Sequence, residues 1–130
     1  MIVSKGRSEP LLQATLLGEA VEHAPVGVFV FDDEGRYVAV NPYACEELGY
    51  TREELLEMRL GDLAVSRREA MKTYQSALGD GVAEATTRAR RKDGTEIVLH
   101  FRARATKIAG ITFYIAIAWP ESHGGTEVPP

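Results

Sequence analysis

The stretch that most constrains the fold runs from Gly27 to Leu55, GVFVFDDEGRYVAVNPYACEELGYTREEL. Two short β-type runs flank a charged turn, which is typical of a β-hairpin. The second run stops at Asn41-Pro42, where the Asn side chain can cap a helix and the proline suits the first helical position because it has no N–H. Thr51, with Glu54 three residues later, forms a second start signal, a capping box. The stretch therefore predicts a hairpin that leads directly into short capped helices.

The rest of the chain extends this pattern into one α+β domain. Apolar residues recur at helical spacing over 11–24, and a longer helix is expected over 66–78. Short helices are expected over 43–48 and 51–58, and strands over 26–31, 37–40, 82–91, 95–105 and 111–119. The element order α, ββ, three or four short α, βββ favours a single five-stranded antiparallel sheet with the helices over one face.

The two ends of the chain differ from its middle. Residues 1–10 and 120–130 are rich in polar residues, Gly and Pro, so we expect two flexible segments around one domain over 11–119. The N-terminal segment lacks the continuous apolar stretch of a signal peptide or a membrane span. Cys45 is the only cysteine and excludes an internal disulfide. These features predict a cytoplasmic protein without a membrane partner.

Charge and motif content exclude several function classes. The net charge of −4 does not suit nucleic-acid binding, and the one basic cluster, Arg88 to Lys92, is followed at once by Asp93. The carboxylates cluster in expected caps and turns, and no Ser-His-Asp or metal-ligand spacing occurs. We therefore expect no enzyme, no catalytic residue, no metal site and no nucleic-acid partner.

The turns and caps, taken in order, resemble the PAS family of sensor domains. The resemblance covers about Leu11 to Trp119, and four pieces carry it: Asp32-x-x-Gly35; Asn41-Pro-Tyr-Ala44 leading to Leu48-Gly49-Tyr50; Thr51-Arg-Glu-Glu-Leu55 before Gly61; and Arg88-x-x-x-Lys92-Asp93-Gly94 before a long strand. It implies a signalling module that binds a small molecule or cofactor between sheet and helices, or a second protein on the sheet. The resemblance alone does not choose among these, because one fold hosts many functions.

Two cofactors known in this family do not suit the residues present. PAS domains that resemble the oxygen sensors carry an axial histidine on the long helix, which here has none, and His100 lies in phase with Val98, opposite Leu99 and Phe101. PAS domains that resemble the flavin photoreceptors carry a reactive cysteine in an Asn-Cys-Arg-Phe run on a later helix. This chain has RLGDL at 59–63 instead and carries Cys45 on an earlier helix. The sequence thus argues against heme and photoactive flavin and leaves a noncovalent small molecule open, including a noncovalently bound flavin.

One predicted strand carries only small side chains on one phase, namely Ala83, Ala85, Thr87 and Ala89. If this phase faces the helices, it leaves room for a ligand, although these residues could equally belong to a core filled at native density. The candidate pocket residues are Val28, Val30, Tyr37, Asn41, Leu48, Met58, Leu63, Met71, Tyr74, Thr87, Leu99, Phe101, Phe113 and Ile115.

The opposite phase of the sheet is also apolar, although a sheet covered on one side should be polar on the other. We expect the helix over 11–24 to cover this outer face, either from the same chain or from a second copy, and so predict a homodimer. The candidate dimer-interface residues are Leu12, Leu16, Ala20, Phe29, Phe31, Val38, Val40 and Tyr114.

Two functions remain open. The first is a non-catalytic sensory or regulatory domain in signal transduction, which binds a ligand, dimerises and passes the change to an effector domain or protein. The alternative is a pure protein-interaction or dimerisation module with a filled core and no ligand. A void in the core and a bound compound would separate the two.

Overall fold

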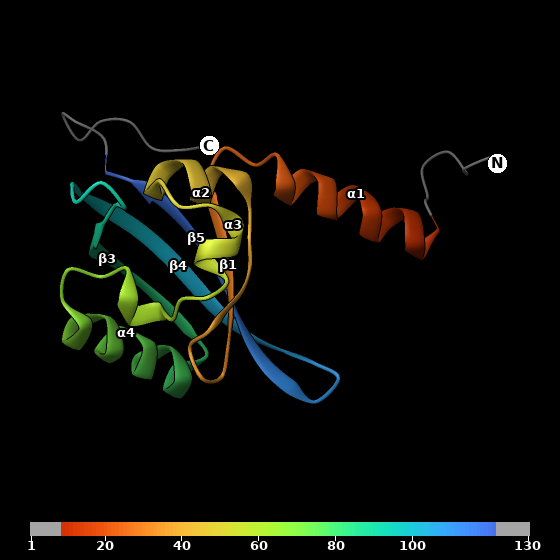
Figure 1. Ribbon diagram of the computed structural model, residues 1–130. Helices are drawn as coiled ribbons and strands as arrows, with labels where there is room; N and C mark the ends of the chain where they lie inside the picture. Colours follow the sequence, from red (N-terminus) through yellow and green to blue (C-terminus); the bar gives the residue numbers. More distant parts are fainter. Residues whose placement is uncertain (1–8, 122–130) are drawn as a thin grey trace.

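The computed structural model describes residues 9–121, apart from the side chains of residues 77 and 78. The elements are α1 (Pro10–Glu22), β1 (Gly27–Asp32), β2 (Tyr37–Val40), α2 (Pro42–Leu48), α3 (Arg52–Leu55), the 3₁₀ helix η1 (Leu60–Asp62), α4 (Arg67–Asp80), β3 (Val82–Arg90), β4 (Glu96–Ile108) and β5 (Ile111–Pro120). The strands form one antiparallel sheet in the order β2-β1-β5-β4-β3, and α2, α3, η1 and α4 lie over one face (Figure 1). The predicted fold class is confirmed.

The element bounds differ from the prediction in a few places. α3 ends at Leu55 because the following backbone tightens into short-range bonds, with Met58 N donating to Leu55 O. β4 continues past the expected end to Ile108. Pro10 and Pro120 were expected in the flexible segments, but they are the first residue of α1 and the last residue of β5. The remainder of those segments falls outside the described residues, except for Glu9 and Glu121.

The β1–β2 turn is organised by Asp32. One carboxylate oxygen of Asp32 accepts from the backbone N–H groups of Glu34 and Arg36, both at 2.9 Å, and the other accepts from the Arg36 guanidinium at 2.9 Å. Gly35 supplies the positive φ of 80° that the turn needs. Burial alone would raise the pKa of Asp32, but the hydrogen bonds from Arg36 and Glu34 hold it below its ordinary value.

Asn41 joins three elements. Its Oδ1 accepts from the backbone N–H groups of Val28 and Ala44, at 2.9 and 3.1 Å. Its Nδ2 donates to the carbonyls of Val21 and Val26, both at 2.9 Å. The residue is only 2% exposed, and its two lone pairs and two N–H groups are all used. Asn41 therefore caps α2 as expected and also binds the last turn of α1 to β1.

Helix α1 makes few contacts with the sheet of its own chain. None of its residues is buried, and Figure 1 shows it extending away from the sheet. Besides the bond to Asn41, its last turn is held by an ion pair of 3.1 Å between Glu22 and Arg52, whose guanidinium also donates to the Val40 carbonyl. Within one chain α1 thus does not cover the outer face of the sheet; cover by a second copy stays a prediction.

The predicted faces of β1 and β5 were wrong. Phe29 and Phe31, expected on the outer face, are 6% and 4% exposed and face the helices, whereas Val30 lies on the other side. In the register with β5, Phe31 pairs with Tyr114, which is buried on the same side. Both phases of β1 are apolar, so alternation could not choose between them, and a change of one position exchanges every side chain.

A β-bulge explains the error on β2. Phe29 pairs with Val40 and Phe31 with Tyr37, so the register shifts and Val38 is the extra residue. The bulge places Tyr37 and Val40 on the helix side together, although strict alternation would put them on opposite faces. Val38 is exposed, as predicted for an outer-face residue.

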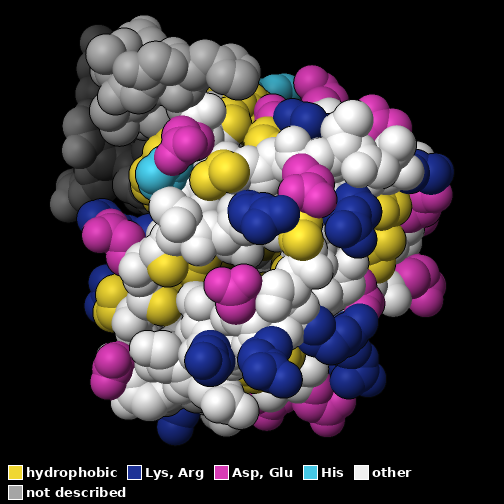
Figure 2. All heavy atoms as spheres, turned by 90° about the vertical axis from the view of Figure 1, so that its left-hand side faces the viewer, with side chains coloured by type: hydrophobic (Ala, Val, Ile, Leu, Met, Phe, Trp, Pro, Cys, Tyr) yellow, Lys and Arg dark blue, Asp and Glu magenta, His cyan; other side chains and the backbone are white. Residues whose placement is uncertain are grey.

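The surface of the α4 and β3 side carries both signs of charge. Lys and Arg side chains and Asp and Glu side chains both occur on it, and several Lys and Arg side chains lie close together in the lower part of the view (Figure 2). Within residues 9–121, no helix has the length and apolar character needed to cross a bilayer.

Candidate functional site: a cavity between sheet and helices

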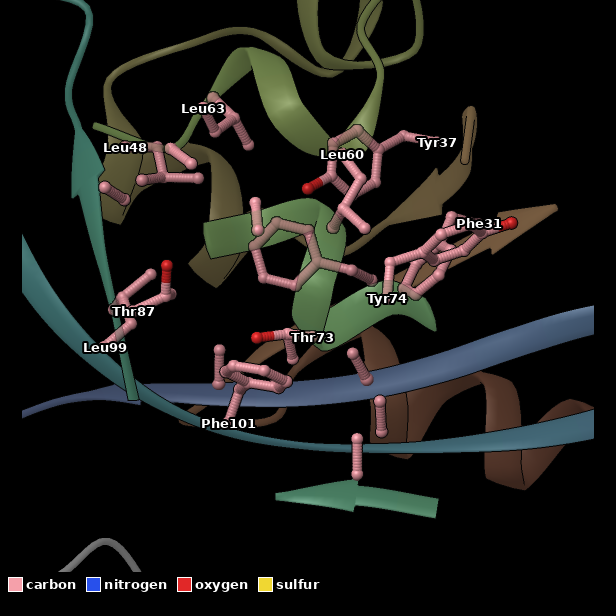
Figure 3. Close-up of a pocket in the computed structure, with 18 residues that line it drawn as sticks. Phe31, Tyr37, Leu48, Leu60, Leu63, Thr73, Tyr74, Thr87, Leu99 and Phe101 are labelled. Atoms are coloured by element: carbon pink, nitrogen blue, oxygen red, sulfur yellow. The ribbon is translucent and has the colours of Figure 1, made fainter. Parts of the chain in front are cut away.

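A cavity of about 100 Å³ lies between the sheet and the helices that cover it (Figure 3). All five strands contribute to its wall, together with α2, α4 and the segment that includes η1. The lining residues are Phe29, Phe31, Tyr37, Leu48, Leu60, Leu63, Ala64, Ala70, Thr73, Tyr74, Ala83, Thr87, Ala89, Leu99, Phe101, Ala103, Ala116 and Ala118.

Small side chains on three adjacent strands leave the space open. Ala103 of β4 lies between its strand partners Ala83 of β3 and Ala116 of β5, and all three line the cavity. The methyl group of alanine extends only a short distance from the sheet, whereas Leu or Phe at these positions would fill the cavity. The small phase of β3 does face the helices, through Ala83, Thr87 and Ala89, although Ala85 does not reach the cavity.

One end of the cavity is closed by packed aromatic rings. Phe31 stacks on Tyr114 with ring centroids 5.2 Å apart, and Tyr74 of α4 lies 5.6 Å from each of them. The Tyr74 hydroxyl donates to the Asp33 carbonyl at 2.6 Å, which fastens α4 to the β1–β2 turn. Burial, followed by the neighbouring Tyr114 and Asp33, raises the pKa of Tyr74 to about 12, so the hydroxyl keeps its proton.

The wall carries polar groups at few points, and all of them are hydroxyls. Besides Tyr74, the lining includes Tyr37, Thr73 and Thr87 but no charged side chain. Thr73 donates to the Glu69 carbonyl of its own helix at 3.2 Å. The labelled oxygens of Tyr37 and Thr87 lie on opposite sides of the open space in Figure 3. The site therefore suits a mostly apolar, uncharged molecule and offers no acid–base or nucleophilic pair for catalysis.

Seven of the fourteen predicted pocket residues line the cavity: Tyr37, Leu48, Leu63, Tyr74, Thr87, Leu99 and Phe101. The other seven do not: Val28, Val30, Asn41, Met58, Met71, Phe113 and Ile115.

Three physical reasons account for the seven residues placed elsewhere. The reversed faces of β1 and β5 remove the two valines, Phe113 and Ile115. Asn41 has no hydrogen-bonding capacity left for a ligand. Met71 lies on the exposed side of α4, and Met58 packs at the edge of the core.

Sequence reasoning missed lining residues from three sources. Phe29 and Phe31 were placed on the wrong face. Leu60 and Ala64 lie on or just after η1, which is too short for periodicity to orient side chains, and Ala70 and Thr73 lie on α4 beside the predicted Tyr74. The alanines of β4 and β5 had a visible signal, because Ala103, Ala116 and Ala118 continue the same small-residue pattern as β3.

The predicted dimer residues divide in the same way. Phe29, Phe31, Val40 and Tyr114 are buried under the helices and cannot contact a second copy from the outer face. Leu16, Ala20 and Val38 are exposed, and Leu12 is partly exposed. The apolar outer face is formed instead by Val30, Phe113, Ile115, Ile117 and Trp119, of which Ile115 and Ile117 are exposed.

The residues that could hold heme or a photoactive flavin lie away from the cavity. His100 faces outward, as expected from its phase, and stacks on Trp119 with ring centroids 6.1 Å apart. Cys45 on α2 does not line the cavity, and burial raises the pKa of its thiol. Among the described residues, no group of His, Cys, Asp and Glu side chains is placed to hold a metal ion.

Comparison with known proteins agrees with this architecture. A model of the PAS domain family matches residues 25–118. The chain belongs to the PAS domain family. PAS domains are sensory modules of signalling proteins. No curated protein sequence matched this PAS domain.

Solved structures of other PAS domains superpose on most of the chain. A PAS domain from a two-component sensor histidine kinase is 20% identical, with a TM-score of 0.77, covering 86% of this chain and 99% of that one. A domain of a sensory box sensor histidine kinase/response regulator from Geobacter sulfurreducens is 26% identical, with a TM-score of 0.75 and coverages of 85% and 96%. A PAS domain of a LuxR-family transcriptional regulator from Burkholderia thailandensis, in complex with ethanol, is 16% identical, with a TM-score of 0.67 and coverages of 79% and 95%.

Proposed function

We propose that this PAS domain is a non-catalytic sensory module that binds a small molecule in the cavity and transmits its presence through α1. The observation that carries the proposal is the open volume of about 100 Å³ above the alanines of β3, β4 and β5. Native cores leave few voids larger than a water molecule, so this volume supports a ligand site over the alternative of a filled interaction module. The ethanol complex of the Burkholderia thailandensis relative is a precedent for a very small ligand.

A chain of contacts connects the cavity to α1. Leu48 lines the cavity from α2, and α2 begins at its cap Asn41. Asn41 in turn donates to the Val21 carbonyl in the last turn of α1. A ligand that displaces α2 would therefore change the support of α1, through which an effector domain or protein would receive the signal.

The test is native mass spectrometry of protein purified from cells and of protein exposed to metabolite extracts. Wild type should carry a compound that Ala103→Leu, which fills the cavity, does not carry. Ala39→Leu adds the same side chain at an exposed position of β2 and should retain the compound. If the same fraction of protein carries the compound in wild type and in Ala103→Leu, the ligand site is refuted.

The second part of the proposal is a homodimer in which α1 of one copy lies on the outer face of the other. Helix α1 exposes Leu11, Leu16, Leu17 and Val21, and the outer face exposes Ile115 and Ile117. An apolar surface of this kind on both partners favours association. The charges also agree, because α1 carries Glu19 but no Lys or Arg, whereas Arg104 lies next to Ile115 in the sheet.

Sedimentation at tens of micromolar tests the dimer. Ile117→Glu and Leu16→Glu should each shift the protein to monomer, because each places a carboxylate in an apolar contact. Thr86→Glu is the control, since it adds the same charge to an exposed position of β3 that is not one of the apolar residues of β1 and β5. A monomeric wild type, or a dimer that survives Ile117→Glu, would contradict this arrangement. The proposed compartment stays the cytoplasm, on the single cysteine.

A further inference from the structure

The Tyr37 hydroxyl is a buried polar group aimed into the cavity. Tyr37 is 6% exposed, and in Figure 3 its oxygen points into the open space beside Leu60. Within residues 9–121, no group forms a hydrogen bond with this hydroxyl. Every side-chain polar atom of these residues that is fully enclosed has a partner, so the Tyr37 hydroxyl is not fully enclosed. The hydroxyl therefore borders the open volume of the cavity, where a ligand atom can reach it.

The surrounding structure holds this hydroxyl in place. The bulge at Val38 turns Tyr37 toward the helices, and its backbone N–H donates to the Met58 carbonyl at 3.1 Å. Its ring lies 5.6 Å from Phe29 and 6.3 Å from Phe31, between ring centroids. Burial, and to a smaller extent the charge of Asp62, raises the pKa of Tyr37, so the group stays a neutral hydrogen-bond donor.

The rest of the wall limits what the hydroxyl can meet. The lining contains no cation to pair with a carboxylate or phosphate and no anion to pair with an amine. The nearby Asp62 is already bound to the Arg67 guanidinium and the Arg59 backbone N–H, both at 2.8 Å. An ion moved into such a wall would lose its hydration without compensation.

The volume limits the size of the ligand. A dry apolar cavity of about 150 Å³ accepts benzene. This cavity, at about 100 Å³, suits a molecule of that size or smaller.

We propose that the ligand is an uncharged compound no larger than about a six-membered ring, whose single carbonyl, ether or hydroxyl oxygen accepts a hydrogen bond from Tyr37. The proposal rests on the proposed function, because it requires that the cavity binds a ligand. Thr87 lies across the open space from Tyr37, so its hydroxyl faces the other end of the molecule.

The test uses two probes of the same shape, cyclopentanone and methylenecyclopentane, with dissociation constants measured by ligand-observed NMR titration. A ketone loses hydration when it enters an apolar site. The affinity of the ketone relative to the hydrocarbon in the wild type alone is therefore not informative. The informative quantity is the ratio of the two dissociation constants, ketone over hydrocarbon. In Tyr37→Phe this ratio should rise about fivefold, the value of one neutral hydrogen bond.

Tyr43→Phe is the matched control, because it removes a tyrosine hydroxyl from α2 outside the cavity lining and should leave the ratio within about twofold. Cyclopentylammonium, of similar size but charged, should show no saturable binding. If both neutral probes bind and the ratio is the same in wild type and Tyr37→Phe, or if the cation displaces cyclopentanone, the ligand class is wrong while the binding site stands. If neither neutral probe binds wild type at any soluble concentration, the ligand site falls together with the inference.

Discussion

Replacing Asn41 with alanine should destabilise the domain by more than the loss of a helix cap. An N-cap contributes about 1 kcal/mol. Asn41 also accepts from the buried Val28 N–H and donates to the Val26 carbonyl, and alanine leaves both without a partner. A buried donor that loses its partner costs about 1–3 kcal/mol. The Val21 carbonyl lies at a helix end and can bind water instead, so it adds little.

The expected total is about 3 kcal/mol, a large part of the 5–15 kcal/mol that holds an ordinary domain together. In urea unfolding with a slope of about 1.5 kcal/mol per M, the midpoint would fall by about 2 M. Tryptophan fluorescence of Trp119 and far-UV circular dichroism can follow the same transition.

Thr51→Ala is the matched control, because Thr51 caps α3 by accepting from the Glu54 N–H at 3.1 Å on the exposed surface. It should cost about 1 kcal/mol. Asn41→Asp should fall between the two alanine variants, since the carboxylate keeps both N–H bonds but faces the Val21 and Val26 carbonyls without a proton to donate. If Asn41→Ala and Thr51→Ala lower the free energy of unfolding equally, the bonds to β1 and α1 add nothing and the reasoning fails.

Three further outcomes are expected. Ala109→Asn should raise the free energy of unfolding by about 1 kcal/mol, because Ala109 has a φ of 54° in the β4–β5 turn, where Asn is tolerated; a lower melting temperature would contradict this. Tyr74→Phe should lower it by about 1 kcal/mol through loss of the bond to the Asp33 carbonyl, whereas no change in urea midpoint would show that water replaces this bond. Asp32→Asn should be less stable than wild type at pH 7. Because the pKa of Asp32 is lowered in the folded state, its stabilisation is present above the unfolded value of about 3.9 and is lost as the pH falls through the folded value, so the difference should shrink below about pH 4. A gap that stays constant down to pH 2 would assign the effect to something other than the carboxylate.

Local signals in the sequence determined the elements of this protein. The Asn41 cap, the Thr51 capping box and the glycines at positive φ each act over three or four residues, so the caps and turns they mark occur where they were expected. The small residues of β3 were also visible in the sequence, and the structure places Ala83, Thr87 and Ala89 on the side that faces the helices. With the order of the elements, these signals were sufficient for the α+β sheet and the resemblance to PAS domains.

Only the tertiary structure decided which faces of β1, β2 and β5 are covered. Both phases of these strands are apolar, so burial gives no preference until Phe31 is placed beside Tyr114, far away in the chain, and Val38 is left as the extra residue of a bulge. The cavity depends on the same non-local register, because Ala83, Ala103 and Ala116 leave a void only when their strands pair side by side. A cap or turn is stabilised by residues three or four positions away in the chain. The covered face of a strand is set by pairing with residues tens of positions away, and a single sequence does not specify that pairing.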